Sequence, residues 1–293
     1  MVFRLEQGET IGAGLGRVAT EETRRARGAL LSDLDPEAGV LEARKSFKKV
    51  RAILRFSRGA LGKPHFRSEN VRFRDLGRRL APQRAAAARF QTLDRLETEG
   101  APPDRVLQGA RRRLATRRRR RDDASVRAEV ARALTGGGPG FEAVEGFEAL
   151  ASGLARTYRK GGKRMRDAIE APSAEAFHEW RKRVKDLWYQ VRLLRNAWPE
   201  VLDSLADELH RLSRHLGAAH DLDLLEAALR EEARLDLHFD PSPLFPRLEA
   251  ERAAERDAAL ELGRRLYAED PEGFVTRIEG YWHGWHESEI PVA

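Results

Sequence analysis

Residues 41–58 read LEARKSFKKVRAILRFSR, and residues 178–195 read HEWRKRVKDLWYQVRLLR. A shift of 137 residues places the first stretch over the second, and six of the 18 aligned positions are then identical. The identical pairs are Glu42/Glu179, Arg44/Arg181, Lys45/Lys182, Lys48/Lys185, Arg55/Arg192 and Arg58/Arg195, of which five are basic. A repeat offset by nearly half of the chain indicates two units with a shared plan.

An α-helix would gather the cations of each stretch on one narrow stripe, because successive residues turn by 100°. The first stripe holds Arg44, Lys48, Arg51, Arg55 and Arg58, and the second holds Arg181, Lys185, Trp188, Arg192 and Arg195. Each stripe adjoins the apolar face of its helix, which favours a groove between helices. Like charges at i, i+4 destabilise a helix, and neither stripe contains an acid, so the pattern favours a bound anion.

The rest of the chain has the spacing of helices and almost no strand signals. Asp35-Pro36-Glu37 and Asp270-Pro271-Glu272 each offer a cap, a proline for the first helical position and an acid in the first turn. The predicted helices are 8–33, 37–60, 67–98, 104–135, 142–170, 174–196, 199–233, 244–268 and a short helix 271–285. The prediction is all-α: two tandem four-helix bundles related by the internal repeat and enclosing a basic central channel.

We expect one domain over 1–293. It comprises a first repeat 1–135, a glycine-rich linker 136–141, a second repeat 142–270, and a short helix with a tail 271–293. The repeat continues past the stripes, since a shift of 136 places residues 76–80 over 212–216.

Composition narrows the function classes. Lys and Arg number 54 against 47 Asp and Glu, a net charge of +7, so a nucleic acid, a membrane surface or another anion is a suitable partner. There is no cysteine, which excludes disulfides and thiolate metal sites and suits a cytoplasmic protein. No stretch approaches the roughly 20 apolar residues of a membrane span.

Several other basic elements could join the stripes. Residues 158–164 read YRKGGKR, and a break at the glycines would leave backbone N–H groups for an oxyanion or merely a flexible helix end. Arginine fills eight of the eleven positions from Arg111 to Arg121, on all sides of a helix, which favours a solvated face. His178 begins the second stripe and could donate to phosphate or simply pack. His220 is expected at a helix bend, paired with Asp221.

Enzyme signatures are weak in this sequence. Gly12, Gly14 and Gly16 follow no strand and precede no Walker lysine, which argues against a nucleotide-binding loop. The histidines His283 and His286 fall in the expected tail and lack metal-ligand spacing. Carboxylates that would hold Mg²⁺ for phosphoryl transfer are missing from the stripes. We therefore expect a binding protein, with no catalytic residue, metal or cofactor.

The doubled pattern resembles the CHAD family, the conserved histidine α-helical domain. Its histidine, arginine and lysine at positions 1, 4 and 8 are similar to His178, Arg181 and Lys185, and its Leu-Gly-x-x-x-Asp element is similar to residues 216–221. The resemblance covers about residues 3–270. Two departures stand out, because Leu41 occupies the first-repeat histidine position and Trp188 replaces an arginine.

The resemblance implies two helical bundles that bind inorganic polyphosphate, or phosphate and sulfate ions, without catalysis, with polyphosphate granules as an expected location. A nucleic-acid binder, above all of RNA, is the alternative, although aromatic residues for base stacking make up only 7%. The predicted binding residues are Arg27, Arg44, Lys45, Lys48, Arg51, Arg55, Arg74, Arg78, Arg164, His178, Arg181, Lys182, Lys185, Tyr189, Arg192 and Arg214.

Overall fold

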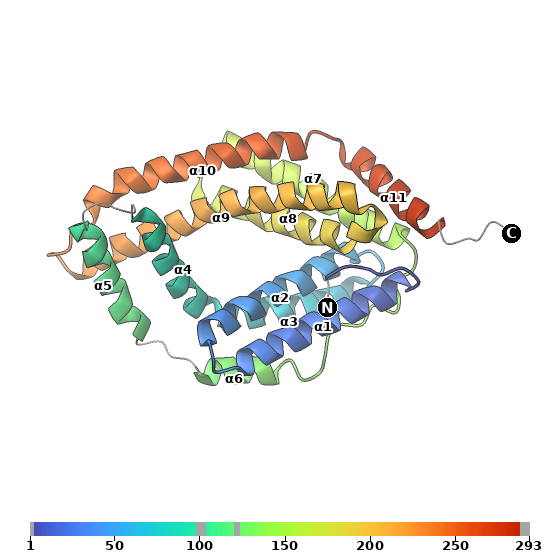
Figure 1. The fold of residues 1–293 in the computed structure, drawn as a ribbon, viewed down its shortest axis with the longest axis horizontal. Helices are drawn as coiled ribbons and strands as arrows, with labels where there is room; N and C mark the ends of the chain where they lie inside the picture. The colour runs from blue at the N-terminus through green and yellow to red at the C-terminus, as the bar shows by residue number, and fades with distance from the viewer. Residues whose placement is uncertain (1–2, 98–103, 120–123, 288–293) are drawn as a thin grey trace.

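The computed structural model describes residues 3–97, 104–119 and 124–287, leaving aside the side chains of 83–86 and 116–119. All regular structure in these residues is helical, which confirms the predicted fold class (Figure 1). The elements are α1 (Ile11–Leu31), α2 (Pro36–Phe56), α3 (Lys63–Arg79), α4 (Ala81–Leu96), α5 (Arg105–Arg119), α6 (Ala124–Arg132), α7 (Glu148–Glu170), α8 (Ala174–Leu193), η1 (Arg195–Ala197), α9 (Pro199–Leu235), η2 (Ser242–Leu244), α10 (Phe245–Leu266) and α11 (Pro271–Glu287).

Side-chain caps set the starts of the helices that matter most for the site. The carboxylate of Asp35 accepts from the backbone N–H of Ala38 and begins α2, and the Ser173 hydroxyl accepts from Ala176 and begins α8. These bonds satisfy N–H groups that the first turn leaves without a helical acceptor. The predicted starts of α2 and α11 agree with the structure to within one residue.

Two predicted long helices are each divided in the structure. The predicted helix 67–98 is broken at Leu80, because Pro82 in the first turn of α4 has no N–H to continue the ladder of α3. The predicted helix 104–135 becomes α5 and α6, and the residues between them lie outside the described part of the chain. The predicted helix 142–170 begins late, at Glu148, after a loop in which Gly146 has a φ of +65°.

The helices form two groups joined by α4 and α5 (Figure 1). In that view α1, α2, α3 and α6 lie in the lower half, α7 to α11 lie in the upper half, and α4 runs from the end of α3 to α9. Helix α2 packs along α1 and α3 and also against α8, so the two helices that carry the basic stripes touch each other. The stripes are therefore brought to one region of the molecule.

The apolar side chains of the described residues form three cores, and the long helix α9 contributes to each of them. Leu202 and Leu209 enter the core shared with α1, α2, α7 and α8. Leu212 and Leu216 enter a second core with α7, α8 and α10. Leu222, Leu225 and Leu229 enter a third core with α4, α5 and α10. Helix α9 thus fixes the separation between the cores.

One close approach positions α7 against the end of α2. A Cβ added at Gly153 would overlap the carbonyl oxygen of Phe56 and lie 2.9 Å from that of Arg55. Only glycine allows the two backbones to come this near. The contact places the second turn of α7 beside the C-terminal turn of α2.

None of the described helices is both long enough and apolar enough to cross a membrane.

Candidate functional site

The stripe of α2 faces α3. Arg44 donates to the carbonyl of Gly77, and the Nε of Arg51 donates to the Oδ1 of Asn70 over 3.1 Å. The guanidinium of Arg58 lies 4.7 Å from the centre of the Phe66 ring. The first stripe is therefore held between two helices and does not cover a free helix face.

The stripe of α8 faces α9 in the same manner. The rings of Trp188 and His210 stack with their centres 4.5 Å apart, and those of His178 and His220 lie 4.2 Å apart. A Cβ added at Gly217 would lie 3.1 Å from the Nη2 of Arg181. Both predicted stripes therefore line helix–helix junctions.

The contacts also correct the alignment of the repeat beyond the stripes. Arg44 contacts Gly77, whereas its counterpart Arg181 contacts Gly217. Gly77 follows Leu76 and Gly217 follows Leu216, so the structure pairs the two Leu-Gly steps. The shift of 136 had placed Gly77 over Ser213.

Cations of both stripes act on the pair His178 and His220. Burial is the main reason that the pKa of His178 falls to about 4, followed by the charges of Lys182 and Arg181. The pKa of His220 falls to about 3, because of burial first and then of the charges of His178 and Arg181. Lys48, which comes from α2, lowers the pKa of both imidazoles. The two basic stripes thus converge here.

The histidine pair has unused hydrogen-bonding capacity. Among the described residues, no hydrogen-bond partner reaches the buried Nδ1 of His178. With pKa values of about 4 and about 3, both rings are neutral at pH 7 and can each gain a proton beside an anion. His220 lies inside α9, which runs without interruption from Pro199 to Leu235, and its ring is tilted against that of His178.

A second concentration of charge lies about two to four turns further along α8. Burial, Arg214, Lys185 and Arg192 lower the pKa of His210, in that order. The guanidinium of Arg192 lies 5.2 Å from the centre of the Trp188 ring, and burial lowers its pKa. The predicted residues Lys185, Arg192 and Arg214 are therefore close together.

A carboxylate of α8 compensates the charge of Arg55. Its Nη1 donates to the Oδ1 of Asp186 over 3.0 Å, and Asp186 also lies 3.0 Å from Arg183. The Arg55 and Asp186 side chains are only 18% and 8% exposed. Asp186 follows Lys185 directly and lies off the stripe, so sequence reasoning did not connect it to the cations. Arg55 ties α2 to α8.

Arg51 lies near this ion pair, on the side of α3. Burial is the main reason that its pKa falls to about 10, and the neighbouring charge of Arg55 is the next. Arg74 of α3 adds to the effect, and Arg74 itself donates to Asp75 over 2.8 Å. Arg78 lies 3.6 Å from the same carboxylate.

The remaining predicted residues lie in more ordinary settings. Tyr189 is buried against Phe3, with ring centres 5.8 Å apart, and burial raises its pKa, so it serves packing. The others are exposed at the surface: Lys182 pairs with Glu179, Lys45 with Glu42 at 3.7 Å, Arg164 with Asp167 at 2.8 Å, and Arg27 is exposed on α1.

Two other basic segments have structural roles. Residues 158–164 lie inside α7, whose helical ladder uses their N–H groups, so the expected break is wrong. In the arginine-rich run, Arg111 pairs with Asp94 at 2.5 Å, and Arg113 pairs with Asp236 and lies 4.4 Å from the centre of the Phe239 ring. The later part of that run falls outside the described side chains.

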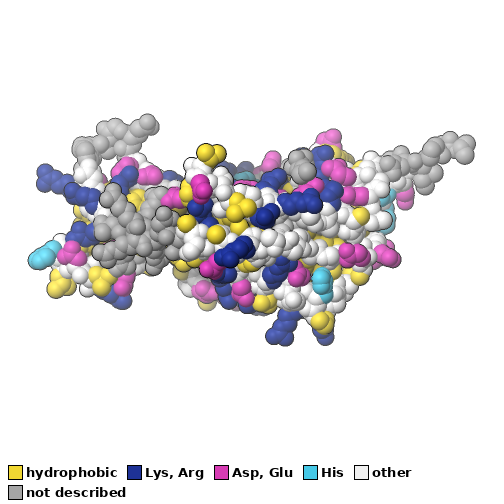
Figure 2. All heavy atoms as spheres, turned by 90° about the horizontal axis from the view of Figure 1, so that it is seen from below, with side chains coloured by type: hydrophobic (Ala, Val, Ile, Leu, Met, Phe, Trp, Pro, Cys, Tyr) yellow, Lys and Arg dark blue, Asp and Glu magenta, His cyan; other side chains and the backbone are white. Residues whose placement is uncertain are grey.

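The face of the molecule drawn in Figure 2 mixes both signs of charge. Figure 2 shows Lys and Arg side chains in several groups on one face, with Asp and Glu between them. Local arrangement therefore distinguishes the site better than net charge does.

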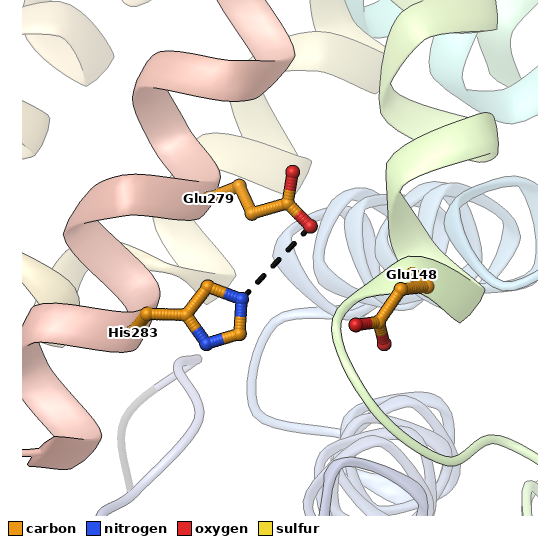
Figure 3. A group of neighbouring side chains, drawn as sticks. All are labelled: Glu148, Glu279 and His283. Carbon is orange, nitrogen blue, oxygen red and sulfur yellow. Dashed lines mark ion pairs between the residues drawn. The ribbon is translucent and has the colours of Figure 1, made fainter.

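A separate group of possible metal ligands lies at the start of α7. Glu279 and His283, one turn apart on α11, lie beside Glu148 at the start of α7 (Figure 3). Their nearest ligand atoms all lie within 4.8 Å of one another, and His283 is 3.9 Å from Glu279. His283 thus belongs to α11 and not to a tail, a correction to the sequence prediction. Glu148 is exposed, as such surface acids usually are, and we assign no ion to the group.

The fold and the site define an all-helical protein in which cations of two related helices converge on a histidine pair. The family model of the CHAD domain matches residues 16–230, and the chain belongs to this family. A search of curated proteins finds no match.

Sequence reasoning named His178 but left His220 and His210 out of the predicted site. The signal that would have found them is the spacing of four residues on α9, namely His210, Arg214, Gly217 and His220. Their spacings of four, three and three place them on one helix face, opposite the second stripe.

Proposed function

We propose that this chain binds inorganic polyphosphate at the junction of α2, α8 and α9, without catalysis. The observation that carries the proposal is the convergence of the two stripes, since Lys48 of one and Arg181 of the other act on the same pair of adjacent imidazoles. Polyphosphate binding is a general property of the family. Association with polyphosphate granules in the cytoplasm is part of the proposal.

The proposal is supported by the electrostatic repulsion that the site contains when no ligand is bound. Several cations packed around two partly buried, neutral imidazoles repel one another, and a phosphate chain would offset that repulsion. Each contact between a guanidinium or ammonium group and a phosphate oxygen is charge-assisted. Release of counterions from the polymer favours association further.

The aromatic side chains near the site favour polyphosphate over a nucleic acid. Trp188 stacks on His210 and lies against Tyr189, and Tyr189 is buried against Phe3. Their faces are thus engaged within the protein and offer little to unpaired bases. A ligand that is phosphate throughout fits these surroundings better.

The test is a double charge reversal, Lys48→Glu with Lys185→Glu. We expect this variant to bind long-chain polyphosphate about a hundredfold more weakly by titration calorimetry, with unchanged helix content, because phosphate contacts dominate such affinities. The matched control is Arg132→Glu with Arg264→Glu, which makes the same change in net charge at exposed positions on α6 and α10.

The same titrations distinguish this proposal from nucleic-acid binding and from an effect of net charge alone. Binding of the wild type that single-stranded RNA displaces at equal phosphate concentration would indicate a nucleic-acid protein. Equal losses in the double variant and its control would show that only net charge matters, and the proposed site would be wrong.

A further inference from the structure

A cluster of cations lies where the C-terminal end of α2 meets α7 and α8, beside the site described above. We call it the α7 cluster, and its members are Arg58, Arg156, Lys160, Arg164 and Arg183. Arg156, Lys160 and Arg164 are spaced four residues apart on α7 and therefore share one face of that helix. None of the three belongs to either stripe.

Backbone packing brings the members of the α7 cluster together. Gly153 lets α7 touch the carbonyl groups of Arg55 and Phe56. Arg156 and Lys160 follow about one and two turns later on α7. Arg58 follows directly after the end of α2 and lies over the Phe66 ring, and Arg183 comes from α8, which packs along α7. Three elements therefore contribute cations to one place.

The charges in the α7 cluster are only partly compensated. Arg183 pairs with Asp186 at 3.0 Å and Arg164 pairs with Asp167 at 2.8 Å. Within the described chain, Arg156 and Lys160 have no ion-pair partner. Burial, followed by Arg183, Arg156, Arg58 and Arg164, lowers the pKa of Lys160, and all four of those neighbours are cations. An anion placed among them would relieve this repulsion.

The α7 cluster is continuous with the cations of α2. Asp186 lies 3.0 Å from both Arg183 and Arg55, so it holds these two guanidinium groups side by side. Arg183 also lowers the pKa of Arg51. A line of cations thus runs from Arg51 across Arg183 to Lys160.

From this arrangement we propose that the α7 cluster is a second phosphate-binding subsite, which holds the continuation of a long polyphosphate chain whose first part lies beside Lys48 and His178. The inference rests on the proposed function. It assigns the cluster a role in selecting chain length, because a short phosphate oligomer would fill the first site without reaching α7. Each additional contact would strengthen binding only for ligands that span both places.

The test compares two ligands on three variants. In Arg156→Glu with Lys160→Glu, we expect affinity for long-chain polyphosphate to fall about tenfold or more, with the slope of log K against log salt reduced by about 1.5. Affinity for tripolyphosphate should stay at the value of the wild type. Lys48→Glu with Lys185→Glu should lose both ligands, and Arg132→Glu with Arg264→Glu is the control for net charge.

Each other outcome is decisive. Wild-type affinity of the α7 variant for the long chain would overturn the second subsite and leave the proposed function standing. An equal loss for both ligands would also overturn it, since α7 would then belong to the first site or act only through net charge. Failure of the wild-type protein to bind either ligand would overturn the proposed function itself.

Discussion

At the scale of single residues, the adjacent pair His178 and His220 is held neutral by burial and by cations from two helices. A ring whose pKa lies at about 4 or about 3 gains no proton at pH 7 while the site is empty. A phosphate placed beside it favours the charged imidazolium and raises that pKa. Binding then takes up protons at every pH between the free and the bound pKa values.

The sign of the resulting pH dependence follows from linkage. Because the complex holds more protons than the free protein, affinity for polyphosphate should rise as the pH falls from about 7 to about 5. We expect His178→Gln with His220→Gln to abolish most of this rise. Titration calorimetry in buffers of different ionisation enthalpy measures the proton uptake directly. A wild-type affinity independent of pH would contradict a role for the pair.

Single residues also show where sequence reasoning reached its limit. The stripes on α2 and α8 were found because helical spacing alone places them, and both helices exist as expected. The aligned positions Lys49 and Asp186 were passed over, although both are buried, in ion pairs with Glu22 and with Arg55. Their partners are far away in sequence, and only tertiary packing reveals them.

At the scale of elements, two helical glycines offer a test of the packing that positions α7. Gly153→Ala should destabilise the protein by about 1–3 kcal/mol, because the new methyl group would overlap the Phe56 carbonyl and force α7 from α2. Gly16→Ala, inside α1, meets no atom within 4 Å and should stabilise by about 0.5–1 kcal/mol. Urea denaturation measures both.

Equal effects of the two substitutions would contradict the close contact. If the α7 cluster depends on this contact, Gly153→Ala should also weaken binding of long-chain polyphosphate more than binding of tripolyphosphate.

The helix boundaries show which local sequence signals were enough to predict where a helix begins or ends. Starts with a capping side chain and an N1 proline, as at Asp35 and Asp270, were predicted closely. The break at Leu80 was missed, although Pro82, which has no N–H for a continuing helix, was a local signal for it. The separate course of α4, toward α9, is set by a core that sequence periodicity cannot locate.

At the scale of the whole molecule, the ion pair of Arg55 with Asp186 is a buried link between α2 and α8. Removing one partner of such a pair leaves an uncompensated buried charge. Asp186→Ala should therefore lower the free energy of unfolding by about 3 kcal/mol, whereas Asp167→Ala, which removes a more exposed carboxylate on α7, should lower it much less.

Guanidinium denaturation followed by circular dichroism compares the two variants. A loss for Asp186→Ala no larger than that for Asp167→Ala would show that the link contributes little. The cysteine-free composition and the all-helical class were accessible from the sequence, whereas this link between sequence-distant helices was not.

The passage of α9 through three cores has a consequence for how this chain can vary. A single inserted or deleted residue between Leu209 and Leu222 would rotate one end of the helix by 100° relative to the other. Either His210 and Arg214 or the side chains of the third core would then no longer face their partners. Changes of about seven or eleven residues, near two or three full turns, preserve the phase. Insertions and deletions among relatives should therefore occur in the loops that flank α9, and the number of residues inside α9 should stay constant.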